Sequence, residues 1–291
     1  MKILLTGKTG QIGGELKNLV SDLGTLVTVD RNELDLSNPE SIESKILEIK
    51  PNLIINTAAY TAVDKAEEEP DLAMMINGKT PGLMANAAKK VGAGLIHYST
   101  DYVFDGHSKT PYREEDPTNP LSVYGKTKLA GEKAITEAGI PFLILRTSWI
   151  YSLQGKNFLL SMLRLAERDT LRIVDDQIGA PTWSRSVAQQ TKKIIQQCLK
   201  ENWLESKNSE LSGIYHLTCQ GETSWYGFAR QIFNSSETTK NIQLIPIPTS
   251  EYPTPATRPS YSRLSNEKVK KVFSVEMPSW EAALKDCINS K

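Results

Sequence analysis

The chain has 291 residues, with 34 lysines and arginines balanced by 34 aspartates and glutamates. This balance excludes a broad basic surface that would attract nucleic acid or an anionic membrane, so a small-molecule partner is expected. Cys198, Cys219 and Cys287 form no Cys-x-x-Cys pair, which argues against a disulfide framework and a structural zinc site. The apolar run after Met1 is too short for a signal peptide or a membrane span, and we expect a cytoplasmic protein.

Apolar runs of strand length alternate with helical patterns through the first half of the chain. The expected strands are Ile3–Leu5, Leu26–Val29, Leu53–Ile55, Leu95–Tyr98 and Phe142–Leu145, and the expected helices are Glu15–Val20, Ser41–Ile49, Thr80–Val91 and Tyr124–Ala138. Continuous apolar strands between helices are typical of a parallel sheet covered on both faces. The predicted fold class is therefore α/β, a doubly wound parallel sheet of the Rossmann type.

After Arg146 the alternation becomes irregular. The sequence predicts helices at Ser186–Trp203 and Trp225–Phe233, a strand at Gly213–Leu217 and an irregular proline-rich segment at Pro246–Pro259. We predict a dinucleotide-binding domain over residues 1–149, rejoined by about 185–220, and a smaller substrate-binding lobe over 150–184 and 221–291. This lobe is expected to supply one wall of a pocket, because ligands of such folds bind beyond the carboxyl ends of the strands.

A glycine-rich turn joins the first strand to the first helix. Gly7 permits a tight turn, Gly10 lets backbone amides approach a pyrophosphate, and Gly13 allows the helix to pack closely on the strand. The turn is not a Walker loop, because no Gly-Lys-Ser/Thr follows at the required place. A dinucleotide is therefore expected rather than phosphotransfer, although glycines here can also serve packing alone.

The ends of the second and third strands carry further candidate cofactor residues. Asp30 is placed to accept hydrogen bonds from a ribose, whereas Arg31 suits a 2′-phosphate or is simply an exposed charge, so NADH and NADPH both stay open. Asp35 and Leu36 continue this region as a candidate adenine pocket. Small side chains in the segment 56–60, which follows the third strand, would let the dinucleotide lie against the backbone, or would serve ordinary close packing.

Three residues further along have the types and order of a proton-transfer site. Tyr124 and Lys128 are four residues apart, so a helix places both on one face, and a nearby ammonium lowers the pKa of a tyrosine. Thr100 follows the fourth strand, where a hydroxyl can hydrogen-bond a substrate carbonyl. The alternative is a half-buried ring beside a solvated charge.

With the glycine turn, these residues resemble the extended short-chain dehydrogenase/reductases, and more narrowly the dTDP-4-dehydrorhamnose reductases. The matching runs are 62–67, 99–104, 123–132, 146–149, 176–182 and Arg258-Pro259. The resemblance implies reduction of the 4-keto group of dTDP-6-deoxy-L-lyxo-4-hexulose by NADPH or NADH, which gives dTDP-L-rhamnose.

The resemblance also implies residue roles. Thr100, Tyr124 and Lys128 become catalytic; the cofactor is expected on Gly10, Gln11, Ile12, Asp30, Asp35, Leu36, Ala58, Ala59, Tyr60, Tyr98, Tyr124 and Lys128, and the nucleotide-sugar substrate on Val63, Thr100, Asp101 and Trp149. Arg258 is a candidate for the diphosphate, because a guanidinium forks onto phosphate oxygens. From the sequence pattern alone, without the resemblance, Trp149 is expected to be a core residue and Arg258 an exposed surface charge.

The chain departs from the family pattern in two places. The loop 152–157 differs from the usual one, which leaves its substrate contacts open. Some relatives form a magnesium-bridged dimer through a glutamate of the first helix; Glu15 is present, but residues 183–188 offer no acidic partner. We therefore expect no metal site, and a monomer or a homodimer. His97 is expected as a core imidazole, and Trp203, Trp225 and Trp280 as packing residues.

Two rival functions stay open at this point. A nucleotide-sugar epimerase or dehydratase shares the fold, but dehydratases usually need a carboxylate pair directly after the threonine, and here Asp101 is followed by Tyr102. A non-catalytic subunit, similar to the regulatory partner of methionine adenosyltransferase, would bind the dinucleotide without a required reduction.

Overall fold

The computed structural model describes residues 1–205, 210–235 and 242–290. Its centre is a six-stranded sheet in the order β10-β5-β4-β3-β1-β2, and every neighbouring pair is parallel. The strands are β1 (Lys2–Thr6), β2 (Thr25–Val29), β3 (Leu53–Asn56), β4 (Gly94–Thr100), β5 (Phe142–Thr147) and β10 (Gly213–His216). The predicted α/β fold is confirmed.

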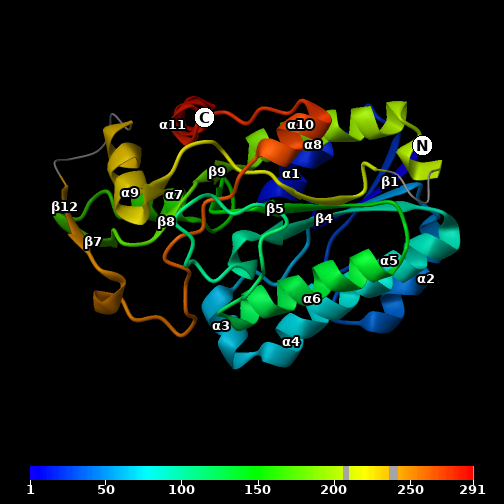
Figure 1. The fold of residues 1–291 in the computed structure, drawn as a ribbon, viewed down its shortest axis with the longest axis horizontal. Helices are drawn as coiled ribbons and strands as arrows, with labels where there is room; N and C mark the ends of the chain where they lie inside the picture. Colours follow the sequence, from blue (N-terminus) through cyan, green and yellow to red (C-terminus); the bar gives the residue numbers. More distant parts are fainter. Residues whose placement is uncertain (206–209, 236–241, 291) are drawn as a thin grey trace.

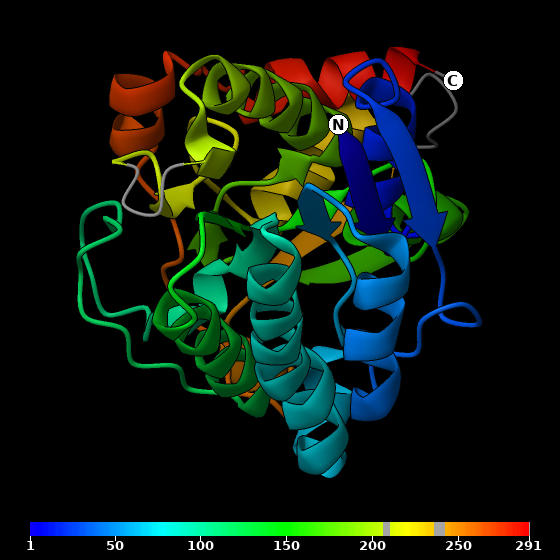
Figure 2. The ribbon, with the colours of Figure 1, turned by 90° about the vertical axis from the view of Figure 1, so that its right-hand side faces the viewer.

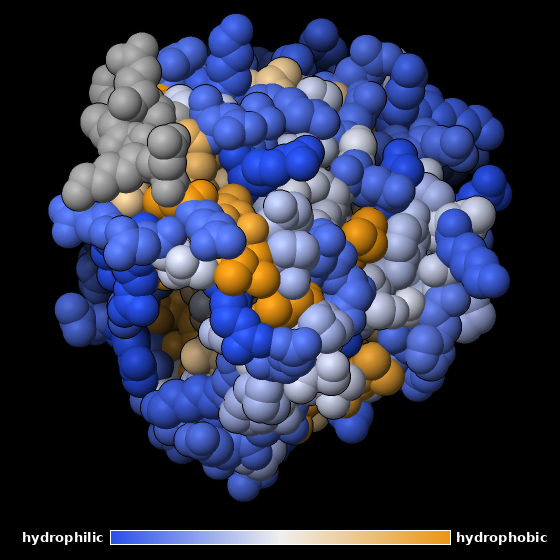
Figure 3. Space-filling view, turned by 90° about the vertical axis from the view of Figure 1, so that its left-hand side faces the viewer, coloured by the Kyte–Doolittle hydropathy of each residue, from blue (hydrophilic) through white to orange (hydrophobic). Residues whose placement is uncertain are grey.

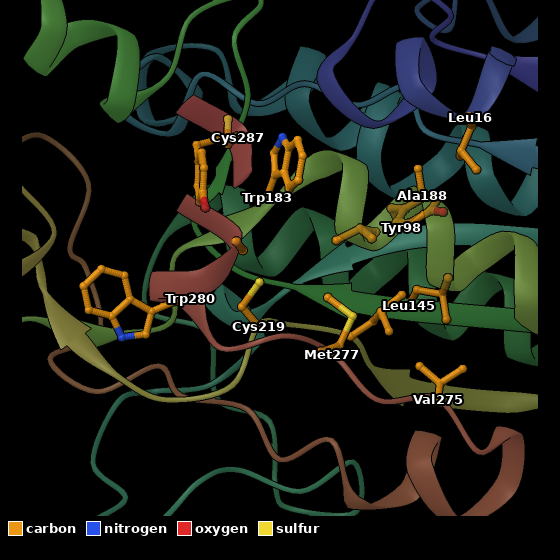
Figure 4. Close-up of a cluster of buried hydrophobic side chains, with 14 of the residues drawn as sticks. Leu16, Tyr98, Leu145, Trp183, Ala188, Cys219, Val275, Met277, Trp280 and Cys287 are labelled. Atoms are coloured by element: carbon orange, nitrogen blue, oxygen red, sulfur yellow. The ribbon is translucent and has the colours of Figure 1, made fainter. Parts of the chain in front are cut away.

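Helices cover both faces of this sheet (Figures 1 and 2). One face carries α2 (Pro39–Ile49), α5 (Thr80–Val91) and α6 (Val123–Glu137), and the other carries α1 (Gln11–Leu19), α8 (Ser184–Lys200), α10 (Glu267–Phe273) and α11 (Trp280–Asn289). Each face has its own buried apolar cluster. Figure 4 shows the cluster in which Leu145 and Tyr98 of the sheet meet Ala188 of α8 and Met277 near the carboxyl end.

Short helices that the sequence analysis did not predict lie between β3 and α5. They are α3 (Val63–Glu68), α4 (Pro70–Met74) and η1 (Met75–Lys79), a π-helical turn that runs directly into α5. The Asn77 side chain on this turn accepts a hydrogen bond from the Tyr60 backbone N–H at 2.8 Å and donates to the Tyr60 carbonyl at 3.0 Å. The turn therefore fixes the loop that follows β3.

The remaining elements gather beyond the carboxyl end of the sheet and in the connections to it. They are β6 (Ile150–Tyr151), α7 (Phe158–Arg164), β7 (Thr170–Val174), β8 (Ile178–Gly179), β9 (Thr182–Trp183), β11 (Thr223–Ser224), α9 (Trp225–Asn234) and β12 (Gln243–Ile247), with the 3₁₀ turns η2 (Asp101–Val103), η3 (Trp203–Glu205) and η4 (Thr249–Glu251). Figure 3 shows this end of the molecule, where apolar residues form patches between polar ones. The division into two domains stays a prediction.

The prediction of an irregular segment over Pro246–Pro259 is partly wrong. Pro246 and Ile247 belong to β12, which pairs in parallel with β7. The sheet of β7 and β12 has two strands, so β12 is an edge strand, and an edge strand tolerates a proline because one side of it needs no ladder hydrogen bond. Among the described residues, no helix is long and apolar enough to cross a membrane.

A buried ion pair holds α6 against the sheet. The Arg146 guanidinium on β5 donates to both carboxylate oxygens of Glu132, at 2.9 and 2.7 Å, and both side chains are 2% exposed. The guanidinium also lies over the Phe104 ring, 5.1 Å from its centroid. This contact fixes the position of the helix that carries Tyr124 and Lys128.

We predict that Glu132→Ala lowers the free energy of unfolding by about 3–5 kcal/mol, because it leaves the Arg146 charge buried without its partner. Urea unfolding followed by circular dichroism measures this change. The control is Glu137→Ala, an exposed glutamate on the same helix. Equal stability of the two variants would contradict a structural role for the pair.

Candidate active site

A cavity of about 810 Å³ opens at the carboxyl ends of the central strands. Its walls bring together most of the residues that the sequence analysis singled out: Gly7, Gly10, Gln11, Ile12, Asp30, Arg31, Asp35, Leu36, Ala58, Ala59, Tyr60, Val63, Tyr98, Thr100, Asp101, Tyr124, Lys128 and Trp149. Gly13 and Arg258 are not among its walls. One cavity therefore includes both the glycine turn and the region around Tyr124, the two parts of the predicted site.

The glycine turn is packed so closely that side chains are excluded. Gly7 has a φ of 74°, and a Cβ on Gly13 would lie 2.2 Å from the Gly7 carbonyl oxygen and 2.6 Å from Thr57 Oγ1. The first turn of α1 therefore lies directly against the end of β3, with its backbone at the cavity. These features fit a dinucleotide, whose pyrophosphate needs close approach to backbone amides at a helix N-terminus.

The end of β2 carries opposite charges in one small region. The Asn32 backbone N–H donates to Asp30 at 2.9 Å and holds the pKa of that carboxyl below its usual value, with Lys8 3.3 Å away adding to the effect. Arg31 is exposed, and its guanidinium lies 3.7 Å from Asp35. An ionised Asp30 suits ribose hydroxyls and Arg31 suits a phosphate, so both cofactor options persist.

Helix α6 brings its first turn against the end of β4. Ser122 caps the helix by accepting the Gly125 N–H at 3.2 Å. A Cβ at Gly125 would lie 2.2 Å from the Tyr102 carbonyl oxygen, so only glycine allows this approach. The Tyr124 ring consequently meets Tyr102 edge to face, with 5.6 Å between ring centroids.

Thr100, Asp101 and Tyr124 form a compact polar group at the inner end of the cavity. The Thr100 hydroxyl donates to Asp101 Oδ1 at 2.9 Å. Burial raises the pKa of Asp101 to about 6 and that of Tyr124 to about 12, and a hydrogen bond with Thr100 opposes the latter rise. A phenol with a raised pKa holds its proton firmly, so Tyr124 is present as an acid.

The orientation of Lys128 differs from the one expected from sequence. Its amine donates to the Tyr98 carbonyl at 2.6 Å and lies 3.1 Å from His97 Nε2, and its side chain is 1% exposed. Burial lowers the pKa of Lys128 to about 8. The expected lowering of the Tyr124 pKa by this lysine does not occur in this arrangement, because desolvation of the tyrosine dominates.

The Tyr98 hydroxyl points away from this group. It hydrogen-bonds Thr191 Oγ1 of α8 at 2.7 Å, and burial raises its pKa. The contribution of Tyr98 to the catalytic end is therefore its backbone carbonyl, which holds Lys128.

Two tryptophans form the wall beyond Tyr124. Trp149 has a φ of 46°, a region that residues other than glycine rarely adopt, and its ring stacks on Trp225 at 3.6 Å between centroids with an interplanar angle of 6°. Trp225 Nε1 donates to Gln177 Oε1 at 3.2 Å. Sequence reasoning placed Trp225 in the core, whereas it lines the cavity. No local signal distinguishes it, because its place depends on how α9 folds back towards β5.

Arg258 makes a different contact from the one expected. Its guanidinium donates to Asp64 at 2.8 Å and also hydrogen-bonds Thr254, which ties the proline-rich loop to α3. Asp64 follows Val63, which does line the cavity. In this structure Arg258 is therefore engaged with Asp64 and is not among the residues that line the cavity, and its contact with the diphosphate stays a prediction.

The loop 152–157 is tied to the glycine turn. Gln11 Oε1 accepts hydrogen bonds from Ser152 Oγ at 3.0 Å and from Asn157 Nδ2 at 2.9 Å. Lys156 of this loop is exposed and lines the cavity, and the sequence analysis did not single it out. The loop thus joins the cofactor end of the cavity to the lobe.

Glu15 of α1 pairs with Arg185 of α8 at 2.9 Å. Glu15 is thus paired with a cation of the same chain, and the described residues contain no group of three histidine, cysteine or acidic side chains suited to a metal ion. Magnesium has no support from this geometry.

The profile of the RmlD substrate binding domain family matches residues 1–291. The chain belongs to this family. It is 45% identical to the dTDP-4-dehydrorhamnose reductase of Burkholderia thailandensis over 99% of this chain and 98% of that protein. Among solved structures, the chain matches a dTDP-4-dehydrorhamnose reductase of Clostridium acetobutylicum at 39% identity and a TM-score of 0.90, covering 100% of this chain and 99% of the other.

A second solved structure concerns the cofactor. The dTDP-4-dehydrorhamnose reductase of Bacillus anthracis, in complex with NADP, is 34% identical, with a TM-score of 0.89 and coverage of 100% of this chain and 99% of the other. A member of the RmlD family with this fold therefore holds NADP.

We predict that Gly13→Ala weakens dinucleotide binding by about 5- to 150-fold, because overpacking of about 1–3 kcal/mol must displace the turn that approaches the pyrophosphate. Titration with NADPH, followed by its fluorescence, measures the dissociation constant. The matched control is Gly14→Ala, whose Cβ would meet no atom closer than 3.7 Å, so its affinity is expected to be unchanged. Equal affinities for both variants would contradict this placement of the pyrophosphate.

Proposed function

We propose that the chain reduces the 4-keto group of dTDP-6-deoxy-L-lyxo-4-hexulose to form dTDP-L-rhamnose. The observation that carries this proposal is one cavity that joins a dinucleotide-type glycine turn to the trio Thr100, Tyr124 and Lys128. Relatives with full-length similarity support the choice of sugar.

The residues at the inner end divide the work. When bound, a nicotinamide cofactor supplies the hydride. When the sugar binds, the Thr100 hydroxyl turns its proton from Asp101 Oδ1 to the carbonyl oxygen of the sugar, and Tyr124 protonates the alkoxide that develops there. The high pKa of Tyr124 keeps its proton on the phenol until that alkoxide forms. The position of Lys128, held by Tyr98, places an amine beside this centre.

The substrate lies on the lobe side of the cavity in this proposal. Trp149 and Trp225 offer flat apolar surface to the sugar or the base, Val63 borders the same space, and Asp101 accepts hydrogen bonds from sugar hydroxyls. Arg258 contributes through Asp64, by holding α3 and the proline-rich loop together.

Both rival functions make different predictions. An epimerase or dehydratase retains and recycles its cofactor, whereas a reductase consumes one NADPH or NADH for each sugar. A regulatory subunit binds the dinucleotide and a methionine adenosyltransferase without turnover. The test is to add the dTDP-keto sugar to the protein with NADPH and, separately, NADH, and to follow absorbance and product. Stoichiometric oxidation with formation of dTDP-L-rhamnose supports the proposal; cofactor that stays unconsumed overturns it.

We predict that Tyr124→Phe lowers kcat at least about 10²-fold, because general acid catalysis typically contributes that much, while dinucleotide affinity stays nearly unchanged. The control is Tyr112→Phe, which removes a phenol bonded to Asp105 outside the cavity. Unchanged turnover of Tyr124→Phe would remove the tyrosine from the proposed role.

Cofactor choice is proposed to depend on the two neighbours at the end of β2. We predict that Arg31→Ala raises KM for NADPH about 10-fold and leaves KM for NADH unchanged, because it removes the cation that faces a 2′-phosphate. Steady-state kinetics with each cofactor measure the two values. Equal increases in KM for NADPH and for NADH would show that Arg31 does not bind the 2′-phosphate.

A further inference from the structure

A row of buried polar side chains runs back from Lys128 through the sheet, and the mechanism above does not use it. His97 lies on β4, Asn56 on β3 and Thr6 on β1, and none of the four side chains is more than 2% exposed. Buried polar groups are expected to satisfy each other, so donors and acceptors along the row must match.

The orientation of Asn56 is fixed at one end. Its Oδ1 accepts the Thr6 hydroxyl at 2.6 Å and the Ala58 backbone N–H at 3.2 Å. A backbone N–H can only donate, so the oxygen of the amide must lie on this side. The Asn56 Nδ2 group therefore faces His97 Nδ1, at 3.0 Å.

This orientation determines the tautomer of His97. An amide NH₂ can only donate, so His97 Nδ1 must accept and the ring proton must lie on Nε2. Burial and the nearby Lys128 lower the pKa of His97 well below its usual value, which keeps the ring neutral. The Nε2–H then points at Lys128 Nζ, 3.1 Å away.

An ammonium group has three donors and no acceptor, whereas a neutral amine has a lone pair. Lys128 already donates to the Tyr98 carbonyl. The Nε2–H of His97 is therefore satisfied only when Lys128 is neutral. We propose that Asn56 and His97 are positioning residues of the reductase, which favour the neutral amine of Lys128 through a hydrogen-bond row of fixed direction.

The charged groups around Lys128 do not prevent its amine from being neutral. Several titratable groups lie on α6 and on the elements packed against it. α6 itself carries Tyr124 and Glu132, and the neighbouring elements carry His97 and Tyr98 (β4), Asp101 and Tyr102 (η2), Arg146 (β5) and Glu67 (α3). The charged residues Lys79 of η1, Asp71 of α4, and Lys89 and Lys90 of α5 are exposed. Glu132 raises the pKa of Lys128, but its carboxylate is held by Arg146, and burial outweighs it.

The consequence concerns the proton that Tyr124 gives to the substrate. Each turnover leaves a tyrosine anion. One proton lost by the Lys128 ammonium restores the phenol and leaves the amine, which accepts the His97 Nε2–H, and one proton from water regenerates the ammonium. Because the pKa of Lys128 lies below that of Tyr124, the transfer from the ammonium to the tyrosine anion is favourable, and the lowered pKa of the lysine makes it more so.

The first test needs no activity. The chain has three histidines, so ¹⁵N-histidine labelling gives three ring systems, and His97→Gln identifies the signals of His97. We expect a neutral Nε2–H tautomer across the neutral pH range in the wild-type protein, and the Nδ1–H tautomer in Asn56→Asp, whose carboxylate accepts on both sides. A wild-type Nδ1–H tautomer or an imidazolium would overturn the proposal.

The second test is the pH profile of kcat/KM for reduction. His97→Gln offers an amide oxygen to the ammonium, so the pKa of Lys128 rises and activity persists to higher pH, with the alkaline limb moved up by about one pH unit. The matched control is His216→Gln, a buried histidine on β10 that contacts the Tyr112 carbonyl. A merely structural role lowers kcat or the melting temperature and leaves the limb in place.

The two tests separate this inference from the proposed function on which its kinetic consequence rests. If no keto sugar is reduced, the proposed function fails, and the tautomer of His97 still decides the inference. If His97→Gln folds, binds the dinucleotide and keeps the wild-type alkaline limb, the inference fails while the reductase assignment stands.

Discussion

The contact between Glu132 and Arg146 fixes helix α6 against the sheet, and the candidate site depends on where that helix lies. Two charges that are each 2% exposed are costly to bury, and the fork of hydrogen bonds at 2.9 and 2.7 Å compensates this cost. Because the pair admits one geometry, it sets the rotation of α6. That rotation directs Lys128 towards the sheet and Tyr124 towards the cavity.

A second constraint acts at the other end of the cavity. The carboxyl ends of β1 and β3 are joined through their last residues, Thr6 and Asn56, which are hydrogen-bonded at 2.6 Å. The chain passes from β1 to β2 on one side of β1 and then returns to place β3 on its other side, so the strand order reverses between β1 and β3. Ligands of open α/β sheets bind at such a point. The same Asn56 also faces His97, which lies beside Lys128, so the end of β1 before the glycine turn and the lysine of α6 are linked through one buried amide.

Much of this arrangement follows from the sequence, for identifiable reasons. Continuous apolar strands predict the parallel sheet. Residue type and spacing single out Thr100, Tyr124 and Lys128 as candidate site residues. Pro246 in a strand and Trp225 at the cavity depend on contacts between distant segments, which local pattern does not encode. Arg258 shows the same limit, since its partner Asp64 lies far away in the chain. The orientation of Lys128 was also not predictable, because it depends on the Tyr98 carbonyl and on His97.

The pKa values of Tyr124 and Lys128, which are ordinarily similar, move apart in this structure. Burial raises the tyrosine to about 12 and lowers the lysine to about 8, so the phenol keeps its proton more firmly than the amine does. A site that only donates a proton needs the first property. A site that must also recover that proton in each cycle benefits from the second, because an ammonium of lowered pKa is the stronger acid and gives its proton readily to the tyrosine anion. In our proposal, the buried row from Asn56 to Lys128 adds to the effect of burial on the lysine from within the sheet.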